Sequence, residues 1–375
     1  MKKKILKLIF LSVFILTGCF NNKDGTAEYT SVLKVDEIFT DKDLEQSVDT
    51  SDATNYTVSD NMNIDITKEG VYVISGTAND VSIIVDVTDE EKVQLVLSDL
   101  SISNVSDPCI YVKNADKVFI TTKGTNSLTV TKSFSSDDET NTDAVIFSKD
   151  DLVFNGTGSL DIQSSDNGIT SKDDLKITGG IITINSVNDA LEVNNSIAIT
   201  DGTVTIYSKK DGLHAEYDED TSQGYIYIGG GTFTINASDD AIHATTVIQI
   251  DDGTITTSSR EGLEATYIQI NGGKLTLSAT DDGMNAAKQS KSYVATIEIN
   301  GGYITIDMGQ GDTDAIDSNG YLYINGGTLD IIAQSPFDYD EDAEYNGGKI
   351  IVNGEETNEI TNQFAGGHPG GPGGR

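Results

Sequence analysis

The chain lacks tryptophan altogether, has two cysteines, and carries 24 basic residues against 60 acidic ones. The absence of tryptophan argues against a flat aromatic platform of the kind that binds crystalline cellulose. The shortage of cations leaves a formal net charge of −36, which repels nucleic acid and anionic lipid headgroups and attracts divalent cations. A sustained alternation of Ile, Val and Leu is nevertheless present, and a disordered acidic chain would lack it. We therefore expect a folded, acidic protein that does not bind nucleic acid.

What the chain has in abundance is one repeated pattern: an aliphatic pair, a Gly-Gly corner, a second aliphatic pair and an acidic turn. Clear copies are Tyr225–Ile235, Tyr267–Leu277 and Tyr321–Ile331. The second glycine of the corner recurs at Gly180, Gly202, Gly231, Gly253, Gly273, Gly302, Gly327 and Gly348. Steps of 20 to 29 residues between these glycines are typical of a solenoid with loops inserted into some coils.

Within one copy, aliphatic and polar residues alternate with the period of a β-strand. Ile226 and Ile228, then Phe233 and Ile235, face one side, and the residues between them face the other. The short repeat leaves no room for a helix of about ten residues, and the glycines permit a positive φ at the corner. A leucine-rich repeat would need an asparagine ladder and a helical segment, and a β-propeller a longer repeat. The sequence predicts an all-β fold, a parallel β-helix solenoid with coils of about 20–29 residues.

The N-terminus combines a basic start with an apolar run, which is typical of a secretory signal. Leu16–Cys19 matches the bacterial lipobox, which predicts cleavage before Cys19 and lipidation of its thiol. The alternative is an ordinary signal that happens to contain a cysteine. With the lipobox, we expect an exported protein that is lipid-anchored to the bacterial cell envelope and faces outward. Cys109 would then have no disulfide partner and is expected to be a small buried residue.

These features divide the chain into four parts. Residues 1–18 are the predicted lipoprotein signal peptide, and residues 19–59 a tether and N-terminal cap region. Residues 60–350 form the predicted β-helix, and residues 351–375 a tail rich in Gly and Pro that we expect to be disordered. We expect one long domain and a monomer.

Each coil carries an acidic turn whose aliphatic residue faces the core, so its polar neighbours point outward. Equivalent residues of a solenoid stack about 4.8 Å apart, where two like charges repel by roughly 1 kcal/mol in water and more near a protein surface. Calcium accepts six to eight oxygen ligands in loose geometry and would neutralise such a ladder. The alternative is that each Asp only caps its turn by bonding its own backbone. The predicted metal ligands are Asp166, Asn188, Asp189, Glu192, Asp211, Asp239, Asp240, Glu261, Asp281, Asp282, Asp314 and Asp317.

Four other residues interrupt or border the ladder. His214 and His243 occupy equivalent positions on neighbouring coils, where a zinc site with the adjacent aspartates and simple surface hydrogen bonding are both open. Lys210 and Arg260 stand in a column that is elsewhere acidic or amide. They either balance the charge of the ladder, or one of them acts as a base beside calcium.

These motifs resemble a family, the clostridial-type cellulose- and pectin-binding β-helix proteins, which are similar to family 9 polysaccharide lyases. The resemblance covers roughly residues 60–350 and includes the Gly-Gly and Asp-Gly/Ala coils. Its most specific part is the series Gly70–Gly76, Val93–Leu97, Ala115–Ile120 and Thr125–Leu128. The resemblance implies a right-handed parallel β-helix, bound calcium, and carbohydrate binding without proven catalysis.

The related lyases hold calcium with an Asp-Asp-x-x-Asp pattern and use a lysine to remove the α-proton of a uronate. The nearest matches in this chain are Asn188–Glu192 and Asp239–His243, and neither is intact. Lys210 is the best match to the lysine. These departures favour a protein that binds polysaccharide over one that cleaves it.

The leading hypothesis is a non-catalytic, calcium-binding lipoprotein that recognises a plant-type polysaccharide, either pectin (polygalacturonate) or cellulose. Outward-facing tyrosines are candidates to stack on sugar rings, although ordinary β-propensity also explains them. They are Tyr225, Tyr227, Tyr267, Tyr321 and Tyr323. One alternative is a calcium-dependent, pectate-lyase-like enzyme in which Lys210 or Arg260 takes the proton. The other is a purely structural surface protein or adhesin.

Overall fold

The structure, a computed structural model, describes residues 29–135, 140–217, 219–309 and 313–362. In this part of the chain, 34 strands form one large, mostly parallel sheet. The one helical element there is a short 3₁₀ turn, η1 (Val35–Glu37). No helix of the described residues is long and apolar enough to cross a membrane. The predicted all-β class is confirmed.

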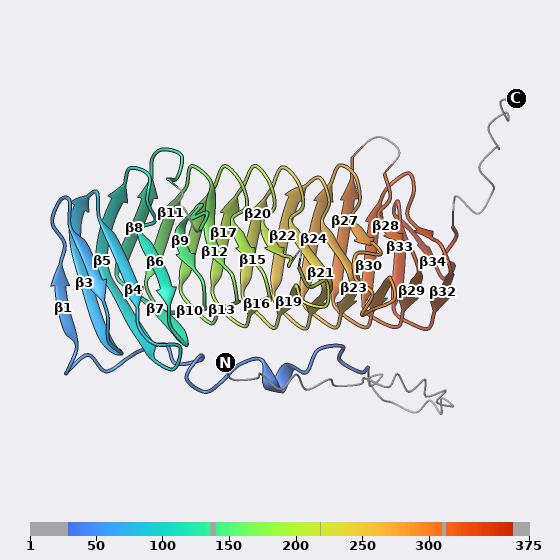
Figure 1. The fold of residues 1–375 in the computed structure, drawn as a ribbon. Helices are drawn as coiled ribbons and strands as arrows, with labels where there is room; N and C mark the ends of the chain where they lie inside the picture. Colours follow the sequence, from blue (N-terminus) through green and yellow to red (C-terminus); the bar gives the residue numbers. More distant parts are fainter. Residues whose placement is uncertain (1–28, 136–139, 218, 310–312, 363–375) are drawn as a thin grey trace, which may run out of the picture.

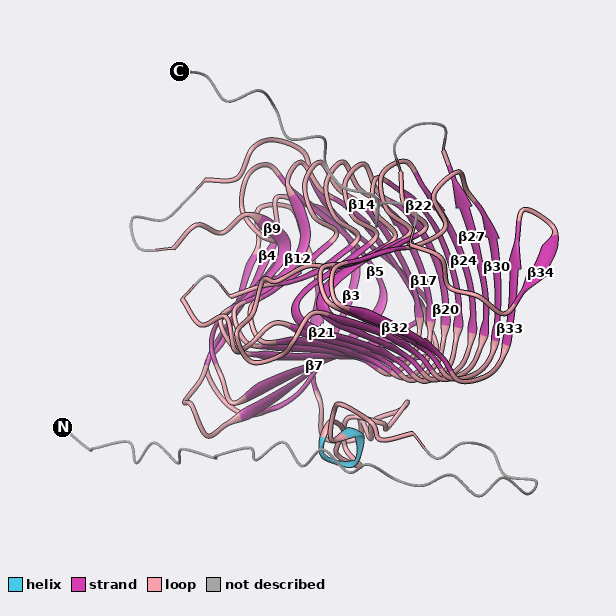
Figure 2. Cartoon of the chain, turned by 90° about the vertical axis from the view of Figure 1, so that its right-hand side faces the viewer, coloured by secondary structure: helices cyan, strands magenta, loops and turns pink. Residues whose placement is uncertain are grey.

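The strands stack in three columns, because most strands pair with the strand three places later in the chain (Figure 1). For example, β13 (Asp174–Ile177) pairs with β16 (Ser196–Ile199), which pairs with β19 (Tyr225–Ile228). One coil therefore consists of three consecutive strands, and the view along the stack shows the coils lying one behind another (Figure 2). This arrangement is consistent with a β-helix solenoid.

The columns are named here in the order in which a coil visits them. The first contains β1 (Thr54–Thr57), the start of β3 (Gly70–Asn79) and of β5 (Lys92–Asn104), β7 (Lys117–Lys123), β10 (Asp151–Gly156), β13, β16, β19, the end of β21 (Ile242–Ile250) and of β23 (Leu263–Ile270), β26 (Thr296–Ile299), β29 (Tyr321–Ile324) and β32 (Asp342–Tyr345). The second contains the ends of β3 and β5, β8 (Thr125–Val130), β11 (Ser159–Gln163), β14 (Ile181–Asn185), β17 (Thr203–Tyr207), β20 (Thr232–Asn236), β22 (Thr254–Ser259), β24 (Lys274–Ala279), β27 (Tyr303–Met308), β30 (Thr328–Ile332) and β33 (Lys349–Val352). The third contains β2 (Asn63–Ile66), β4 (Ser82–Asp86), β6 (Ile110–Asn114), β9 (Ala144–Ser148), β12 (Asn167–Ser171), β15 (Leu191–Val193), β18 (Leu213–Ala215), the starts of β21 and β23, β25 (Met284–Ala286), β28 (Ile316–Ser318) and β31 (Asp338–Tyr339).

The core lies inside the coils and is built from the alternating aliphatic residues. Ile226 and Ile228 are fully buried, and Phe233 and Ile235 are 1% exposed, as the alternation predicts. At the Gly-Gly corner, the coils approach so closely that a β-carbon on Gly302 would lie 2.9 Å from the carbonyl oxygen of the coil below. The acidic turn differs from the expectation in one respect: it leads directly into a short third strand, so a coil has three strands instead of two.

The N-terminal strap, residues 29–49, lies along the outside of the first column (Figures 1 and 2). Its Asp43 is completely buried and forms ion pairs with Lys117 (3.4 Å) and Lys176 (3.0 Å). The side-chain amide of Gln46 donates to the Thr178 carbonyl at 2.8 Å. The described part of the predicted tether and cap is therefore held against the sheet by buried polar contacts.

The solenoid extends beyond the predicted range of residues 60–350 at both ends. β1 begins before residue 60, at Thr54, and pairs in register with β3. At the other end, β33 continues to Val352, and β34 (Glu355–Thr357) folds back on it as an antiparallel strand. Residues 351–357 of the predicted disordered tail thus form the end of β33, a turn and β34. Cys19, the signal segment and residues 363–375 lie outside the described residues.

Candidate cation-binding face

Three rows of polar side chains run along the outside of the third column, one residue of each row per coil. The turn row precedes each short strand and consists of Asn167, Asp189, Asp211, Asp240, Glu261, Asp282 and Asp314. The strand row lies three residues later and consists of Thr170, Glu192, His214, His243, Glu264, Asn285 and Asp317, which are register partners from coil to coil. The outer row precedes the turn row and consists of Asp166, Asn188, Lys210, Asp239, Arg260 and Asp281.

The turn row is held by hydrogen bonds between coils. One carboxylate oxygen of Asp189 accepts the backbone N–H of Asp211 (2.8 Å), and Asp211 in turn accepts the N–H of Asp240 (2.9 Å). Asp282 accepts the N–H of Asp314 in the same way (3.3 Å). The capping alternative predicted a bond within each turn, whereas these bonds join each turn to the next. Asp189, Asp211 and Asp282 therefore each use one oxygen for the neighbouring coil and keep the other for contacts on the surface.

At the N-terminal end of the face, the protein supplies its own partners for the carboxylates. Glu192 accepts hydrogen bonds from Asn167 (2.6 Å) and Thr170 (3.0 Å) and forms an ion pair with Lys172 (3.3 Å). Asp166 accepts a hydrogen bond from the Asn188 side chain. The predicted ligands Asp166, Asn188 and Glu192 thus already have partners within the protein.

Lys210 and Arg260 balance charge along the middle of the face. Lys210 Nζ lies 3.3 Å from Asp189 Oδ2, and although burial opposes it, this carboxylate raises the pKa of Lys210. Arg260 contacts four carboxylates, those of Asp239, Asp240, Glu261 and Asp281. Despite partial burial, these contacts raise the pKa of Arg260 above its already high value. Both side chains therefore stay protonated at neutral pH, which is unfavourable for a general base.

The C-terminal end of the face carries an acidic cluster, defined as Glu261, Asp282, Asn285 and Asp317. Among the described residues, neither Asp282 nor Asp317 forms an ion pair with a lysine or arginine. Burial and the charges of Asp317 and Glu261 raise the pKa of Asp282 to about 8. Burial and neighbouring aspartates likewise raise the pKa of Asp317 to about 7. Of the three carboxylates, Glu261 has Arg260 beside it, whereas ionised Asp282 and Asp317 repel each other with no lysine or arginine of the described residues paired to them.

A neutral oxygen completes the acidic cluster. The side-chain amide of Asn285 donates to Glu261 Oε2 at 3.0 Å, and this contact fixes the amide orientation. The other end of the same amide, Asn285 Oδ1, is buried and has no hydrogen-bond partner among the described residues. An unpartnered amide oxygen beside three carboxylates is the kind of donor set that a hard cation such as calcium takes up. The donor types therefore suit calcium, whereas the three carboxylates are not among the groups of the described residues whose oxygens all lie within 4.8 Å of one another.

A second group of carboxylates was missed in the sequence. Oxygens of Asp151, Asp173 and Asp174 lie within 4.8 Å of one another at the start of two first-column strands. Burial and the Asp151 charge raise the pKa of Asp173 to about 6, while Lys117 lies 3.5 Å from Asp151. The available signal was the sequence Ser-Lys-Asp-Asp-Leu, which occurs twice in succession, at 148–152 and 171–175.

The predicted sugar-stacking tyrosines lie in the first column, and the strap covers part of them. Tyr227 is only 5% exposed and packs against Phe39, with ring centroids 6.2 Å apart. Tyr225 is partly buried against the same segment. Tyr267 donates to Glu298 (2.7 Å), whereas Tyr321 and Tyr323 are partly exposed and stack with centroids 6.0 Å apart. The strap thus separates the predicted tyrosine row into a covered part and an accessible part.

Comparison with known proteins identifies the relationships of the chain. The family described as carbohydrate-binding domain-containing protein matches residues 60–315. The chain belongs to this family. A carbohydrate-binding domain-containing protein of Acetivibrio thermocellus is 39% identical over 265 residues, which are 68% of this chain and 91% of that relative.

A solved structure of similar fold is described as the polysaccharide lyase-like protein from C. thermocellum, gadolinium derivative. It is 33% identical to this member of the carbohydrate-binding family, with a TM-score of 0.53, and the match covers 56% of this chain and 92% of that one. The predicted relationship to carbohydrate-binding and lyase-like proteins is therefore confirmed.

Proposed function

We propose that this protein binds an acidic plant-type polysaccharide such as polygalacturonate, and that calcium held by the acidic cluster bridges the two. Membership of a carbohydrate-binding family supports a polysaccharide partner. The observation that carries the proposal is the pair Asp282 and Asp317, with pKa values raised to about 8 and about 7 next to the unpartnered Asn285 Oδ1. A chain with a net charge of −36 repels a polyanion unless a cation lies between them.

Glu261, Asp282, Asn285 and Asp317 would hold the ion. Calcium accepts six to eight oxygens, so four side chains leave positions that water or a uronate carboxylate of the glycan can fill. When bound, the ion supplies positive charge at the surface, and the protein supplies a fixed row of oxygens. The similar solved structure is a gadolinium derivative, and gadolinium, like calcium, is a hard cation that prefers oxygen ligands.

The proposal extends to the architecture and the location of the protein. The columns would form a right-handed parallel β-helix, as in the resembling family. The lysine-rich start and the lipobox Leu16–Cys19 support export and a lipid anchor at Cys19 on the outer side of the bacterial envelope. A monomer projecting from such an anchor would expose the third column to the polysaccharide.

A uronate lyase is the second candidate, because the similar solved structure is described as polysaccharide lyase-like. A lyase needs a base that can accept the α-proton. The raised pKa values of Lys210 and Arg260 oppose that role for both residues. We therefore propose binding without cleavage.

A retention assay on immobilised polygalacturonate tests both functions. The soluble chain lacking residues 1–19 is applied with calcium or with chelator, and the flow-through is read for the ultraviolet absorbance of unsaturated uronates. We expect calcium-dependent retention, no rise in absorbance, and loss of retention in the double variant Asp282→Asn/Asp317→Asn. Asp65→Asn is the matched control, because Asp65 occupies the exposed side of a third-column strand far from the cluster.

Three results would change the conclusion. Retention that persists in the double variant would remove the acidic cluster from the binding site. Rising absorbance would make the protein a lyase. Retention that is the same with calcium and with chelator would exclude calcium bridging and favour direct recognition of a neutral glycan.

A further inference from the structure

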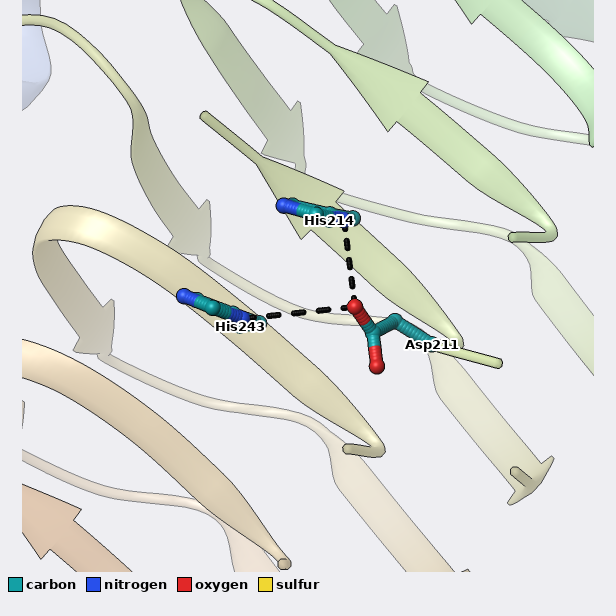
Figure 3. A group of neighbouring side chains, drawn as sticks. All are labelled: Asp211, His214 and His243. Atoms are coloured by element: carbon teal, nitrogen blue, oxygen red, sulfur yellow. Dashed lines mark ion pairs between the residues drawn. The ribbon is translucent and has the colours of Figure 1, made fainter. Parts of the chain in front are cut away.

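Two histidines on neighbouring coils share one aspartate in the middle of the third-column face (Figure 3). His214 from β18 and His243 from β21 are register partners, and their rings stack with centroids 4.8 Å apart and planes 7° apart. Asp211 Oδ2 lies 3.1 Å from His214 Nδ1 and 4.0 Å from His243 Nδ1. The Nδ1 edges of both rings thus face the same carboxylate.

The opposite edges of both rings are held by hydrogen-bond acceptors. His214 Nε2 lies 3.0 Å from Glu216 Oε2, and because a carboxylate only accepts, Nε2 carries the proton. His243 Nε2 lies 3.2 Å from Gln289 Oε1. The Gln289 amide donates to Glu264 at 2.7 Å, which turns its oxygen toward His243 and makes this Nε2 a donor as well. Outer hydrogen bonds of this kind fix the tautomer of metal-binding histidines, with Nδ1 left as the ligand atom.

The inner edge of His214 faces two carboxylates, with Nδ1 3.1 Å from Asp211 Oδ2 and 3.7 Å from Asp189 Oδ2. Its Nδ1 is buried and forms no hydrogen bond of good geometry with any described residue, although Asp211 Oδ2 is close. The face also offers a way in, since a surface cavity of about 400 Å³ is lined by His214, Asp189, Lys210 and Glu216 among others. An ion can therefore approach His214 from solvent.

We propose that Asp211 Oδ2, His214 Nδ1 and His243 Nδ1 bind a divalent first-row transition-metal ion of the zinc type. These ligand atoms lie within 4.8 Å of one another. With metal–ligand bonds of about 2.0–2.1 Å, neighbouring ligand atoms of a tetrahedral site lie roughly 3.4 Å apart, so the 3.1 Å pair of Asp211 Oδ2 and His214 Nδ1 already has this spacing. The two rings are nearly parallel, and because each Nδ1 lone pair lies in its own ring plane, the rings must turn toward the ion as it binds. Asp240 Oδ2, 3.4 Å from His243 Nδ1, stands next to the fourth position.

The ligand set separates this site from the calcium site. Imidazole nitrogen suits zinc, copper and nickel, whereas calcium takes oxygen, and the acidic cluster contains no histidine. The competing state is a pair of imidazolium ions balanced by the aspartates, in which protons occupy the positions that the metal would take. Metal binding would therefore release protons.

Calorimetric titration with Zn²⁺ and the visible absorption of bound Co²⁺ test the site in the soluble chain lacking residues 1–19. We expect one zinc ion per chain, a tetrahedral cobalt spectrum, and at least a tenfold loss of affinity in His214→Gln and in His243→Gln. His368→Gln, which replaces the one histidine outside the described residues, is the matched control and should bind as the parent does. Excess calcium should leave zinc binding unchanged, and so should Asp282→Asn/Asp317→Asn, which keeps this test independent of the proposed polysaccharide function.

X-ray absorption at the zinc edge provides a measurement without substitutions, in case a variant fails to fold. Two imidazole nitrogens per zinc would support the site, and a shell of oxygen alone would overturn it. The proposal also fails if the parent chain takes up no zinc, or if zinc binding survives both histidine substitutions. In either case, the histidines serve only to balance the charge of Asp189, Asp211 and Asp240.

Discussion

Replacing Asp282 by Asn tests whether the acidic cluster is a cation site or only a structural ladder. Asn keeps an oxygen that can accept the Asp314 N–H, a bond of 3.3 Å in the structure, and removes one negative charge. The two interpretations then predict opposite results. A structural ladder loses little, because its hydrogen bond survives. A cation site without its cation becomes more stable, because a repelling charge has gone.

The size of the effect follows from the pKa. Burial and neighbouring carboxylates raise the pKa of Asp282 from 3.8 to about 8, and each pKa unit corresponds to about 1.36 kcal/mol. Fully ionised Asp282 would thus cost the folded state at most about 5–6 kcal/mol. Proton sharing with Asp317 and partial exposure reduce this, so we expect about 2–3 kcal/mol near pH 8.

The sign depends on which state ionises first. Below about pH 4 the carboxyl is protonated in both states, so it costs nothing. Between about pH 4 and pH 8 the unfolded chain ionises and the folded chain does not, so the parent protein loses stability as the pH rises. Calcium reverses this loss, and at a concentration of 100 times its Kd it adds about 2.7 kcal/mol to the folded state.

Urea unfolding near pH 5 and near pH 8, with chelator and with calcium, measures all of these effects. With chelator near pH 8, Asp282→Asn should be more stable than the parent, and calcium should reverse the order. Near pH 5 the difference should be small, and Asp65→Asn should behave as the parent does throughout. The reasoning is refuted if Asp282→Asn is less stable with chelator near pH 8, or if calcium stabilises both chains equally.

Three further substitutions probe other parts of the structure. Arg260→Gln leaves four carboxylates without their shared cation. Urea unfolding with chelator should show a free energy of unfolding lower by about 1–2 kcal/mol, and added salt or calcium should reduce this difference. An unchanged urea midpoint would contradict the prediction. Asp43→Asn leaves the buried Lys176 without its anion and Lys117 with Asp151 alone, at a cost of about 3–5 kcal/mol, and should expose the strap to limited proteolysis. Cleavage at the parent's rate would show that the ion pairs do not hold the strap. Gly283→Ala places a β-carbon 2.5 Å from a backbone oxygen of the next coil and should lower the melting temperature strongly. The control Gly354→Ala, with open space around it and φ of +85°, should cost only about 1 kcal/mol. Equal effects of the two substitutions would refute the close approach of the coils.

The sequence predicted the repeating part of the fold because short, contiguous stretches of sequence encode that part. Alternation marks the strands, and Gly-Gly marks the corner where neighbouring coils touch. The strap could not be found this way, since its contacts join residues far apart in the sequence, such as Gln46 and Thr178, which are 132 positions apart. In the sequence, Asp43 is one of several acidic residues of a polar segment, and only the structure shows Lys117 and Lys176 beside it. For the same reason, the sequence did not predict that the strap covers Tyr225 and Tyr227.

The candidate site was predictable as rows but not as individual partners. Stacking follows from the repeat, and the carboxylate oxygens of the predicted ligands Asp211, Asp239 and Asp240 do lie within 4.8 Å of one another. Which carboxylates are already neutralised depends on the reach of side chains from neighbouring coils. Arg260 contacts four of them, an outcome that spacing alone does not give. Asn285 was not predicted as a ligand because a neutral amide carries no charge signal, yet its buried Oδ1 has no hydrogen-bond partner among the described residues.

The hydrogen bonds of the turn row explain how one ladder can serve different purposes along its length. Asp189, Asp211 and Asp282 each bond the backbone of the next coil through one oxygen, so these turn residues help to hold the coils together. The second oxygen is free to take a partner, and the partner differs from coil to coil. In the middle of the face, Lys210 pairs with Asp189 and Arg260 with Asp240. The two histidines lie beside Asp211 and Asp240. No lysine or arginine of the described residues pairs with Asp282 or Asp317. Under the proposed function, a coil that lacks its own positive charge offers its carboxylates to a bound cation, while the backbone bonds between the coils are kept.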